Sequence, residues 1–174
     1  AREKWGLKEG DKVIMEHIVP CRECYYCQRG LYNLCQVHYI PGVKGVNGGW
    51  AEYMIYPKGA IIHKVPNELP WSAAVLIEPL ACAVHAVERG KIHFEDTVVI
   101  MGDGPIGYLM LEVAKLKNPK MIIVSGHYDE RLKVAKELGA DLVVNSKKED
   151  IVEVVRRETD GIGADVVLEA AGTA

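Results

Sequence analysis

The chain has 174 residues, of which 49% are hydrophobic and 26% are charged, and its formal net charge is −3. This apolar content excludes a protein that is disordered over most of its length, and the length suits one or two domains with a real core. The slightly acidic balance excludes the basic surface expected of a protein that binds nucleic acid or an anionic membrane. The sequence has no run of about 18 apolar residues, so a membrane span is not expected.

Cysteine usage indicates the cellular compartment. Four of the five cysteines lie within residues 21–35, and an odd total argues against a simple disulfide framework. The N-terminal segment AREKWGLKEGDKV lacks the apolar run of a secretory signal. We therefore expect a reducing, cytoplasmic environment, in which clustered cysteines bind metal.

The first part of the chain is predicted to be β-rich and irregular. Glycine and proline separate three short strands, which are expected over residues 12–15, 50–56 and 61–65. Residues 21–35 are expected to form a compact lobe without regular structure. This part therefore predicts a partly closed β-barrel or a distorted sheet.

From Trp71 onward the pattern changes to alternating helices and strands. A short helix is expected over 72–77, an interruption at Pro79, and a second helix that ends at Gly90. The strands that follow are predicted over 97–101, 121–125, 141–144 and 165–169, and the helices over 105–116, 129–138 and 149–159. Val/Ile-rich strands separated by amphipathic helices are typical of a parallel sheet covered on both faces. The predicted fold class is α/β, with one domain over residues 1–78 and a second over 79–174.

The cysteine spacing predicts a structural zinc site. Cys21, Cys24, Cys27 and Cys35 form the pattern C-x2-C-x2-C-x7-C. Four thiolates at about 2.3 Å complete a tetrahedral zinc site and leave no position open for a substrate. Such a site stabilises a lobe that has too few apolar residues to fold alone.

Other interpretations of these cysteines stay open. An iron–sulfur cluster is a rival, although the spacing differs from common ferredoxin patterns. The thiols could also be unliganded or paired in disulfides. A nucleic-acid-binding zinc finger is a further alternative, but the lobe lacks a basic recognition helix. The fifth cysteine, Cys82, is expected to be a core residue on a helix.

A glycine-rich turn follows the predicted strand 97–101. Gly102, Gly104 and Gly107, together with Pro105 and Ile106, form the sequence GDGPIG at the junction of a strand and a helix. In this context the glycines allow a tight turn, close approach of a pyrophosphate, and close packing of the helix against the strand. The sequence predicts a dinucleotide site, and the alternative is a turn used only for packing.

The residues after the second predicted strand bear on the choice of cofactor. A carboxylate that binds the adenosine ribose usually stands there, about 20 residues after the glycines. Gly126 occupies this place, between Ser125 and His127. Because a missing carboxylate removes repulsion against a 2′-phosphate, and Ser125, His127 and Arg131 could contact that phosphate, the sequence favours NADP over NAD. The alternative is an NAD site that lacks this carboxylate.

Several segments occur together in an order known from one enzyme family. These segments are the four-cysteine lobe, residues 49–53 (GWAEY), residues 78–81 (EPLA) and residues 102–107 (GDGPIG). Over essentially its whole length the chain resembles the zinc-dependent medium-chain alcohol dehydrogenases. It is most similar to their polyol branch, the sorbitol, threitol and erythritol dehydrogenases, with threonine dehydrogenase as a cousin. The resemblance implies a partial GroES-like catalytic domain with a zinc lobe, followed by a partial Rossmann domain.

The resemblance also implies an activity. The family transfers hydride between an alcohol or polyol and NAD or NADP, contains a structural and a catalytic zinc, and forms dimers or tetramers. Glu78 matches the glutamate near the catalytic zinc of the polyol branch, where it would bind the metal or a water on it. From the sequence alone, Glu78 is a surface acid at a helix start.

The family's other catalytic-zinc ligands, a cysteine and a Gly-His-Glu segment, lie upstream of the cysteine lobe, and this sequence does not include them. The later Rossmann strands are not included either. We therefore expect an internal fragment of a protein about twice as long. The alternative function is a zinc-stabilised nucleotide-binding module without catalysis.

Overall fold

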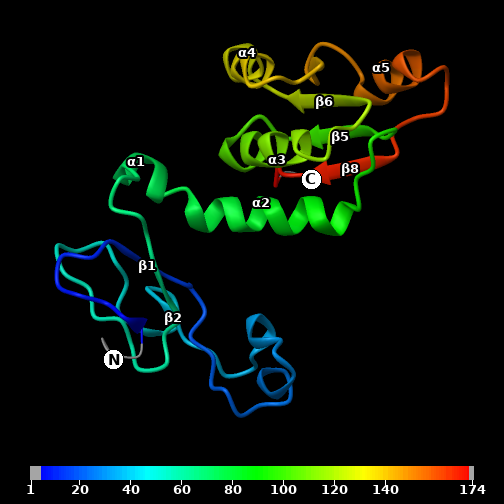
Figure 1. Cartoon of the computed structure of the whole chain (residues 1–174). Coiled ribbons are helices and arrows are strands. Elements are labelled where there is room, and N and C mark those ends of the chain that lie inside the picture. The colour runs from blue at the N-terminus through cyan, green and yellow to red at the C-terminus, as the bar shows by residue number, and fades with distance from the viewer. Residues whose placement is uncertain (1–4, 173–174) are drawn as a thin grey trace. The chain divides into compact units, whose positions relative to one another are not determined.

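The computed structural model describes residues 5–172 of the chain (Figure 1). The chain divides into two compact units, Ala1–Val75 and Leu76–Ala174. The domain boundary expected from the sequence, after Glu78, falls inside the helix α2, Ile77–Gly90. Within residues 5–172, no helix is both long and apolar enough to cross a membrane.

The first unit contains only short elements. Strand β1 (Val13–Met15) pairs antiparallel with β4 (Ile62–Lys64), and β2 (Ile40–Pro41) pairs parallel with β3 (Gly45–Val46). Two 3-10 turns, η2 (Cys27–Arg29) and η3 (Tyr32–Leu34), and the helix α1 (Trp71–Ala74) complete it. The described strands thus form two small pairs rather than a barrel.

The strand expected over residues 50–56 is wrong. The structure describes this segment without a strand, and the side chains of Trp50, Tyr53 and Ile55 are exposed. A strand needs a hydrogen-bonding neighbour, and no described strand pairs with this segment. The alternation of apolar and polar residues therefore does not by itself produce a strand here.

The second unit contains four parallel strands in the order β7-β6-β5-β8. The strands are β5 (Thr97–Met101), β6 (Met121–Gly126), β7 (Leu142–Asn145) and β8 (Val166–Glu169). The helices that follow α2 are α3 (Pro105–Lys115), α4 (Asp129–Glu137) and α5 (Ile151–Glu158). Each observed element lies within about two residues of its predicted range.

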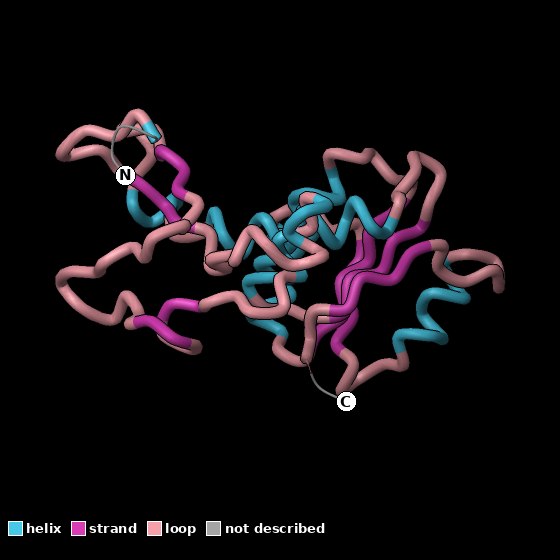
Figure 2. Tube along the Cα trace, turned by 90° about the horizontal axis from the view of Figure 1, so that it is seen from below, coloured by secondary structure: helices cyan, strands magenta, loops and turns pink. Residues whose placement is uncertain are grey.

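The parallel sheet has a buried cluster on each face. Val98 and Ile100 of β5 pack in one cluster together with Leu111 of α3 and Leu132 of α4. Val99, which points to the opposite face, packs in a second cluster with Val154 of α5 and the residues Ile123, Val144 and Val155. This alternation follows from the two-residue period of a strand. Figure 2 shows the strands side by side with helices on either side.

Helix α2 begins before the proline that was expected to interrupt it. Pro79 lies in the first turn of the helix, after Ile77 and Glu78. A backbone N–H in the first turn has no partner within the helix, so proline removes no helical hydrogen bond at this position. The expected interruption is therefore wrong, and a single helix runs to Gly90.

Candidate zinc lobe and cofactor site

The four cysteines of residues 21–35 meet at one point of the first unit. Their sulfur atoms all lie within 4.8 Å of one another, and Cys35 is buried. The Sγ–Sγ distances are 3.9 Å for Cys21–Cys27, 3.9 Å for Cys24–Cys35 and 3.5 Å for Cys35–Cys21. Zinc–sulfur bonds of about 2.3 Å in a tetrahedron place neighbouring sulfurs about 3.8 Å apart. The four thiols are therefore close enough together to bind one zinc ion.

Backbone N–H groups point at these sulfurs. The N–H of Cys24 donates to Sγ of Cys21 at 3.3 Å, and the N–H of Cys21 donates to Sγ of Cys35 at 3.3 Å. Hydrogen bonds from the backbone of Cys27 and Gln36 lower the pKa of Cys24 to about 6. Burial, by contrast, raises the pKa of Cys27 to about 12. The lobe thus stabilises part of the negative charge of the thiolates. A bound cation would neutralise the rest.

The glycine turn lies between β5 and α3 of the second unit. A Cβ on Gly102, whose φ is +132°, would lie 2.7 Å from the carbonyl carbon of Ala170. A Cβ on Gly107 would overlap the carbonyl oxygen of Gly102, so glycine allows α3 to pack directly on the turn. Gly104 precedes the helix as its N-cap, and Pro105 takes the first helical position. The space beside Gly104 is open, which suits close approach of a phosphate.

A cavity of about 340 Å³ opens at the carboxyl ends of the strands. It is lined by most of the predicted cofactor residues, namely Gly102, Gly104, Ser125, Gly126, His127 and Arg131. Pro105, Ile106 and Gly107 do not line it, because they belong to the first turn of α3. Ligands of open parallel sheets bind at this edge of the sheet. The cavity is therefore the candidate cofactor site.

Sequence reasoning missed Asp103, which lines the same cavity. Oδ2 of Asp103 accepts the backbone N–H of His127 at 3.0 Å and that of Tyr128 at 2.9 Å. The side chain is buried, with 8% of its surface exposed. One feature of the sequence could have indicated this role: Asp103 is an acid between two glycines of a tight turn. A side chain at such a place packs on a neighbouring segment.

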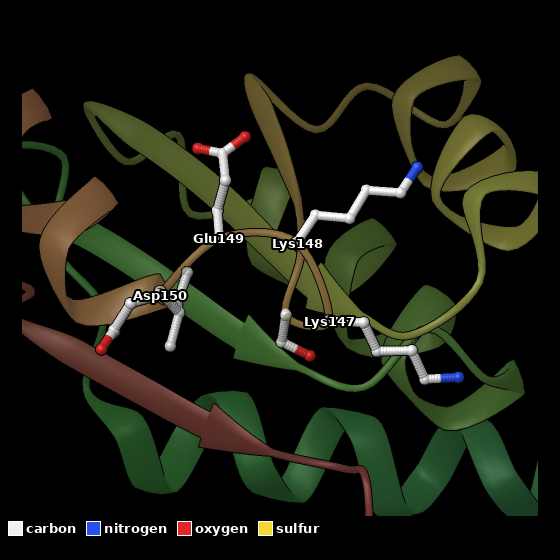
Figure 3. A pocket seen from close by; sticks show the side chains of 6 residues that line it. Lys147, Lys148, Glu149 and Asp150 are labelled. Atoms are coloured by element: carbon white, nitrogen blue, oxygen red, sulfur yellow. The ribbon is translucent and has the colours of Figure 1, made fainter.

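Cations gather near the same turn. The guanidinium carbon of Arg131 lies 4.9 Å from the ring centre of Tyr128, and Nζ of Lys147 lies 4.6 Å from it. Lys147 belongs to the segment between β7 and α5, which lines a neighbouring pocket of about 410 Å³ (Figure 3). Figure 3 shows Lys147 and Lys148 extending away from Asp150. Nζ of Lys148 reaches Oδ2 of Asp129 at 2.6 Å, and this contact lowers the pKa of Asp129.

Two other predicted residues lie on α2. Glu78 is exposed in the first turn of this helix. Among residues 5–172, the metal-ligand cluster that the structure contains is that of the four cysteines, and Glu78 is outside it. Cys82 is exposed, so the expectation of a core cysteine is wrong. It occupies a part of the α2 surface that the described residues leave uncovered.

Comparisons with known proteins agree with this architecture. A family model described as an alcohol dehydrogenase GroES-like domain matches residues 2–67, and one described as a zinc-binding dehydrogenase matches residues 105–174. The erythritol/L-threitol dehydrogenase of Mycolicibacterium smegmatis (strain ATCC 700084 / mc(2)155) is 45% identical over 173 residues, which are 99% of this chain and 48% of the relative. The chain spans about half the length of the curated relatives it matches.

Solved structures show the same similarity. A short chain alcohol dehydrogenase of Escherichia coli CFT073, complexed with NADH, is 33% identical with a TM-score of 0.82, over 96% of this chain and 51% of that one. A Sinorhizobium meliloti 1021 protein bound to NADP is 32% identical with a TM-score of 0.85, over 97% and 49%. These findings confirm the predicted α/β class with a GroES-like part and a parallel sheet. In both of its parts the chain is therefore similar to zinc-dependent alcohol dehydrogenases.

Proposed function

We propose that the whole protein is a dehydrogenase that transfers hydride between an alcohol or polyol and NAD or NADP, with zinc as its metal. The observation that supports this most is the glycine turn at a cavity on the carboxyl edge of a parallel sheet, in a chain that also holds a four-thiol cluster. The identity of 45% with an erythritol/L-threitol dehydrogenase supports a polyol as the substrate class.

The second unit binds and orients the cofactor in this proposal. The open space at Gly104 and the N-terminal turn of α3 attract the pyrophosphate, since a helix N-terminus is electropositive. Ser125, Gly126, His127 and Arg131 surround the adenosine ribose. When bound, the dinucleotide accepts or donates the hydride. The residues of this chain fix its position and exclude water on one side.

The first unit holds the structural zinc. Cys21, Cys24, Cys27 and Cys35 supply four thiolates, which complete the coordination of a tetrahedral zinc. A site without an open position cannot bind a substrate, so its role is to stabilise the lobe of residues 21–35.

Glu78 is assigned to the catalytic zinc of the whole protein, which polarises the substrate hydroxyl when bound. Glu78 is an exposed residue in the first turn of α2. In the whole protein, Glu78→Gln should lower alcohol oxidation at least tenfold, whereas the exposed Glu88→Gln on the same helix should not. Equal activity of both variants would refute the role of Glu78.

The assembly and location of the whole protein complete this proposal. We place it in the cytosol, as a homo-oligomer of two or four subunits that does not bind nucleic acid. The five cysteines without disulfides and the net charge of −3 support the location and the absence of nucleic acid. Light scattering of the whole protein tests the subunit number.

Zinc content and cofactor binding test the proposal on this chain directly. After exhaustive dialysis, elemental analysis should find close to one zinc per chain, and none in Cys35→Ser. Calorimetric titration should show that ADP-ribose binds to the chain and that Gly107→Ala prevents this binding. A folded chain with neither zinc nor ADP-ribose affinity would overturn the proposal.

A further inference from the structure

Asp103 links the two turns that surround the cofactor cavity. Its backbone belongs to the glycine turn after β5, and its carboxylate reaches the turn between β6 and α4. Oδ2 accepts two successive N–H groups there, from His127 and Tyr128, while Oδ1 takes part in neither bond. A buried charge of this kind is less screened by salt than an exposed one.

The carboxylate of Asp103 lies where a side chain of residue 126 would begin. A Cβ on Gly126 would lie 2.5 Å from Oδ2 of Asp103 and would overlap Cβ and Cγ of that side chain. An acid at position 126 and the observed Asp103 are therefore mutually exclusive. Gly126 does not leave the end of β6 without a negative charge, because Asp103 supplies one from the turn after β5.

The two hydrogen bonds also remove donors from the turn. Backbone N–H groups that begin a helix are a common site for phosphate, and α4 begins at Asp129. The N–H groups of His127 and Tyr128, just before it, are already used by Asp103. A 2′-phosphate at this turn would compete with a fixed carboxylate for the same donors and would be repelled by its charge.

The cations near this turn do not outweigh the negative charge of Asp103. The cavity is lined by two acids, Asp103 and Glu169. Arg131 is the one lysine or arginine in this lining. Lys147 lies outside the lining, against the Tyr128 ring, and Lys148 is paired with Asp129. Arg131 is exposed, so its attraction for a phosphate is weakened by solvent and salt.

We propose that Asp103 is a specificity-determining residue that makes this site prefer a dinucleotide with a free 2′-hydroxyl, NAD, over one with a 2′-phosphate, NADP. This inference rests on the proposed dinucleotide function of the cavity. It reverses the preference for NADP drawn from the sequence, since that preference assumed that no carboxylate stands at the ribose end.

Two probes that differ only in the 2′-phosphate test the proposal. ADP-ribose and 2′-phospho-ADP-ribose are titrated calorimetrically into the zinc-loaded chain at low salt. ADP-ribose should bind at least tenfold more tightly, a difference equivalent to about 1.4 kcal/mol. Because the charge of Asp103 is buried and therefore little screened, the ratio should stay above one as salt is raised. A ratio of one or less, at low or at high salt, would overturn the proposal.

Variants separate the charge of Asp103 from its structural role. Asp103→Asn should reduce the ratio to less than threefold, whereas a purely structural loss would weaken both probes equally. The matched control is Asp141→Asn, whose Oδ2 accepts the N–H of Ile122 at the opposite end of β6. The control should keep the wild-type ratio, and an unchanged ratio in Asp103→Asn would refute the proposal.

The two proposals fail in different ways. If both probes bind equally, the dinucleotide site stands and the role of Asp103 is refuted. If neither probe binds to the folded chain, the dinucleotide site is refuted and the inference with it. The salt series needs no variant, so the proposal stays testable even if Asp103→Asn does not fold.

Discussion

The two units of this chain are stabilised by different means. The second unit packs helices on both faces of a parallel sheet, and fully buried side chains such as Ile100, Leu111 and Ile123 fill the two clusters. In the first unit the buried apolar residues among those described are few and mostly small, namely Val19, Cys35, Ala60, Val65 and Ala74. Four thiols replace the missing core there, and a metal bound to them would hold together segments that apolar burial cannot.

The largest expected effect comes from removing the metal. Structural zinc contributes about 10–16 kcal/mol to the folding of small zinc domains. Chelation or Cys35→Ser should therefore remove hydrogen-exchange protection from β1 and β4 and leave the protection of β5 and β6 unchanged. Exchange measured by mass spectrometry with and without zinc checks this outcome.

Cys82→Ser is the control for this prediction, because Cys82 is an exposed thiol on α2. It should keep one zinc and the wild-type exchange pattern. If zinc removal caused a loss of hydrogen-exchange protection in both units, the two units would not be stabilised by different means.

Acidification should weaken the first unit selectively. Backbone hydrogen bonds lower the pKa of Cys24 to about 6, so its thiolate contributes stability that is fully present above 9.0, the ordinary pKa, and is lost as pH falls through 6. Cys27 has a pKa raised to about 12 by burial and ionises near neutral pH only with a cation beside it. Because protons compete with zinc for these thiolates, zinc release to a colorimetric chelator should increase as pH falls from 8 to 5. Release that is constant from pH 8 to pH 5 would contradict this prediction.

An intermediate effect is expected from the core of the second unit. Leu111 is fully buried on α3, and Leu→Ala at such a site costs about 3 kcal/mol of unfolding free energy. Urea unfolding followed by far-UV circular dichroism should show this loss, while the zinc content stays the same. Leu116→Ala, at an exposed position that ends the same helix, should change the free energy by less than about 0.5 kcal/mol. Loss of zinc from Leu111→Ala would show that the units are not independent.

The same contrast explains how much of the fold the sequence could predict. In the second unit, Val/Ile runs and amphipathic helices determine the elements locally, and β5 matches its predicted range in full. In the first unit, residues 50–56 alternate like a strand but have no described partner to pair with. Strand formation depends on a neighbour, so a local pattern could not settle it.

The parts of the candidate site that could be predicted are those that the spacing of residues along the sequence determines. The cysteine spacing gave the thiol cluster, and GDGPIG gave the turn at the cavity. The position of the Asp103 carboxylate depends on how two separate turns approach each other, which the sequence does not contain. For this reason the sequence alone did not reveal that a carboxylate lies beside Gly126.

The smallest effect concerns a single helix end. Oδ1 of Asp150 accepts the N–H of Val152 at 2.7 Å and caps α5, so Asp150→Ala should cost about 1 kcal/mol. The adjacent Glu149→Ala removes only a 4.0 Å contact with Arg157 between two exposed side chains and should cost less than about 0.5 kcal/mol. Urea unfolding of both variants measures the difference. Helix α5 covers one face of the sheet through Val154 and Val155. If Asp150→Ala lowered the free energy of unfolding by much more than Leu111→Ala does, this face, rather than the face packed by α3, would limit the stability of the second unit.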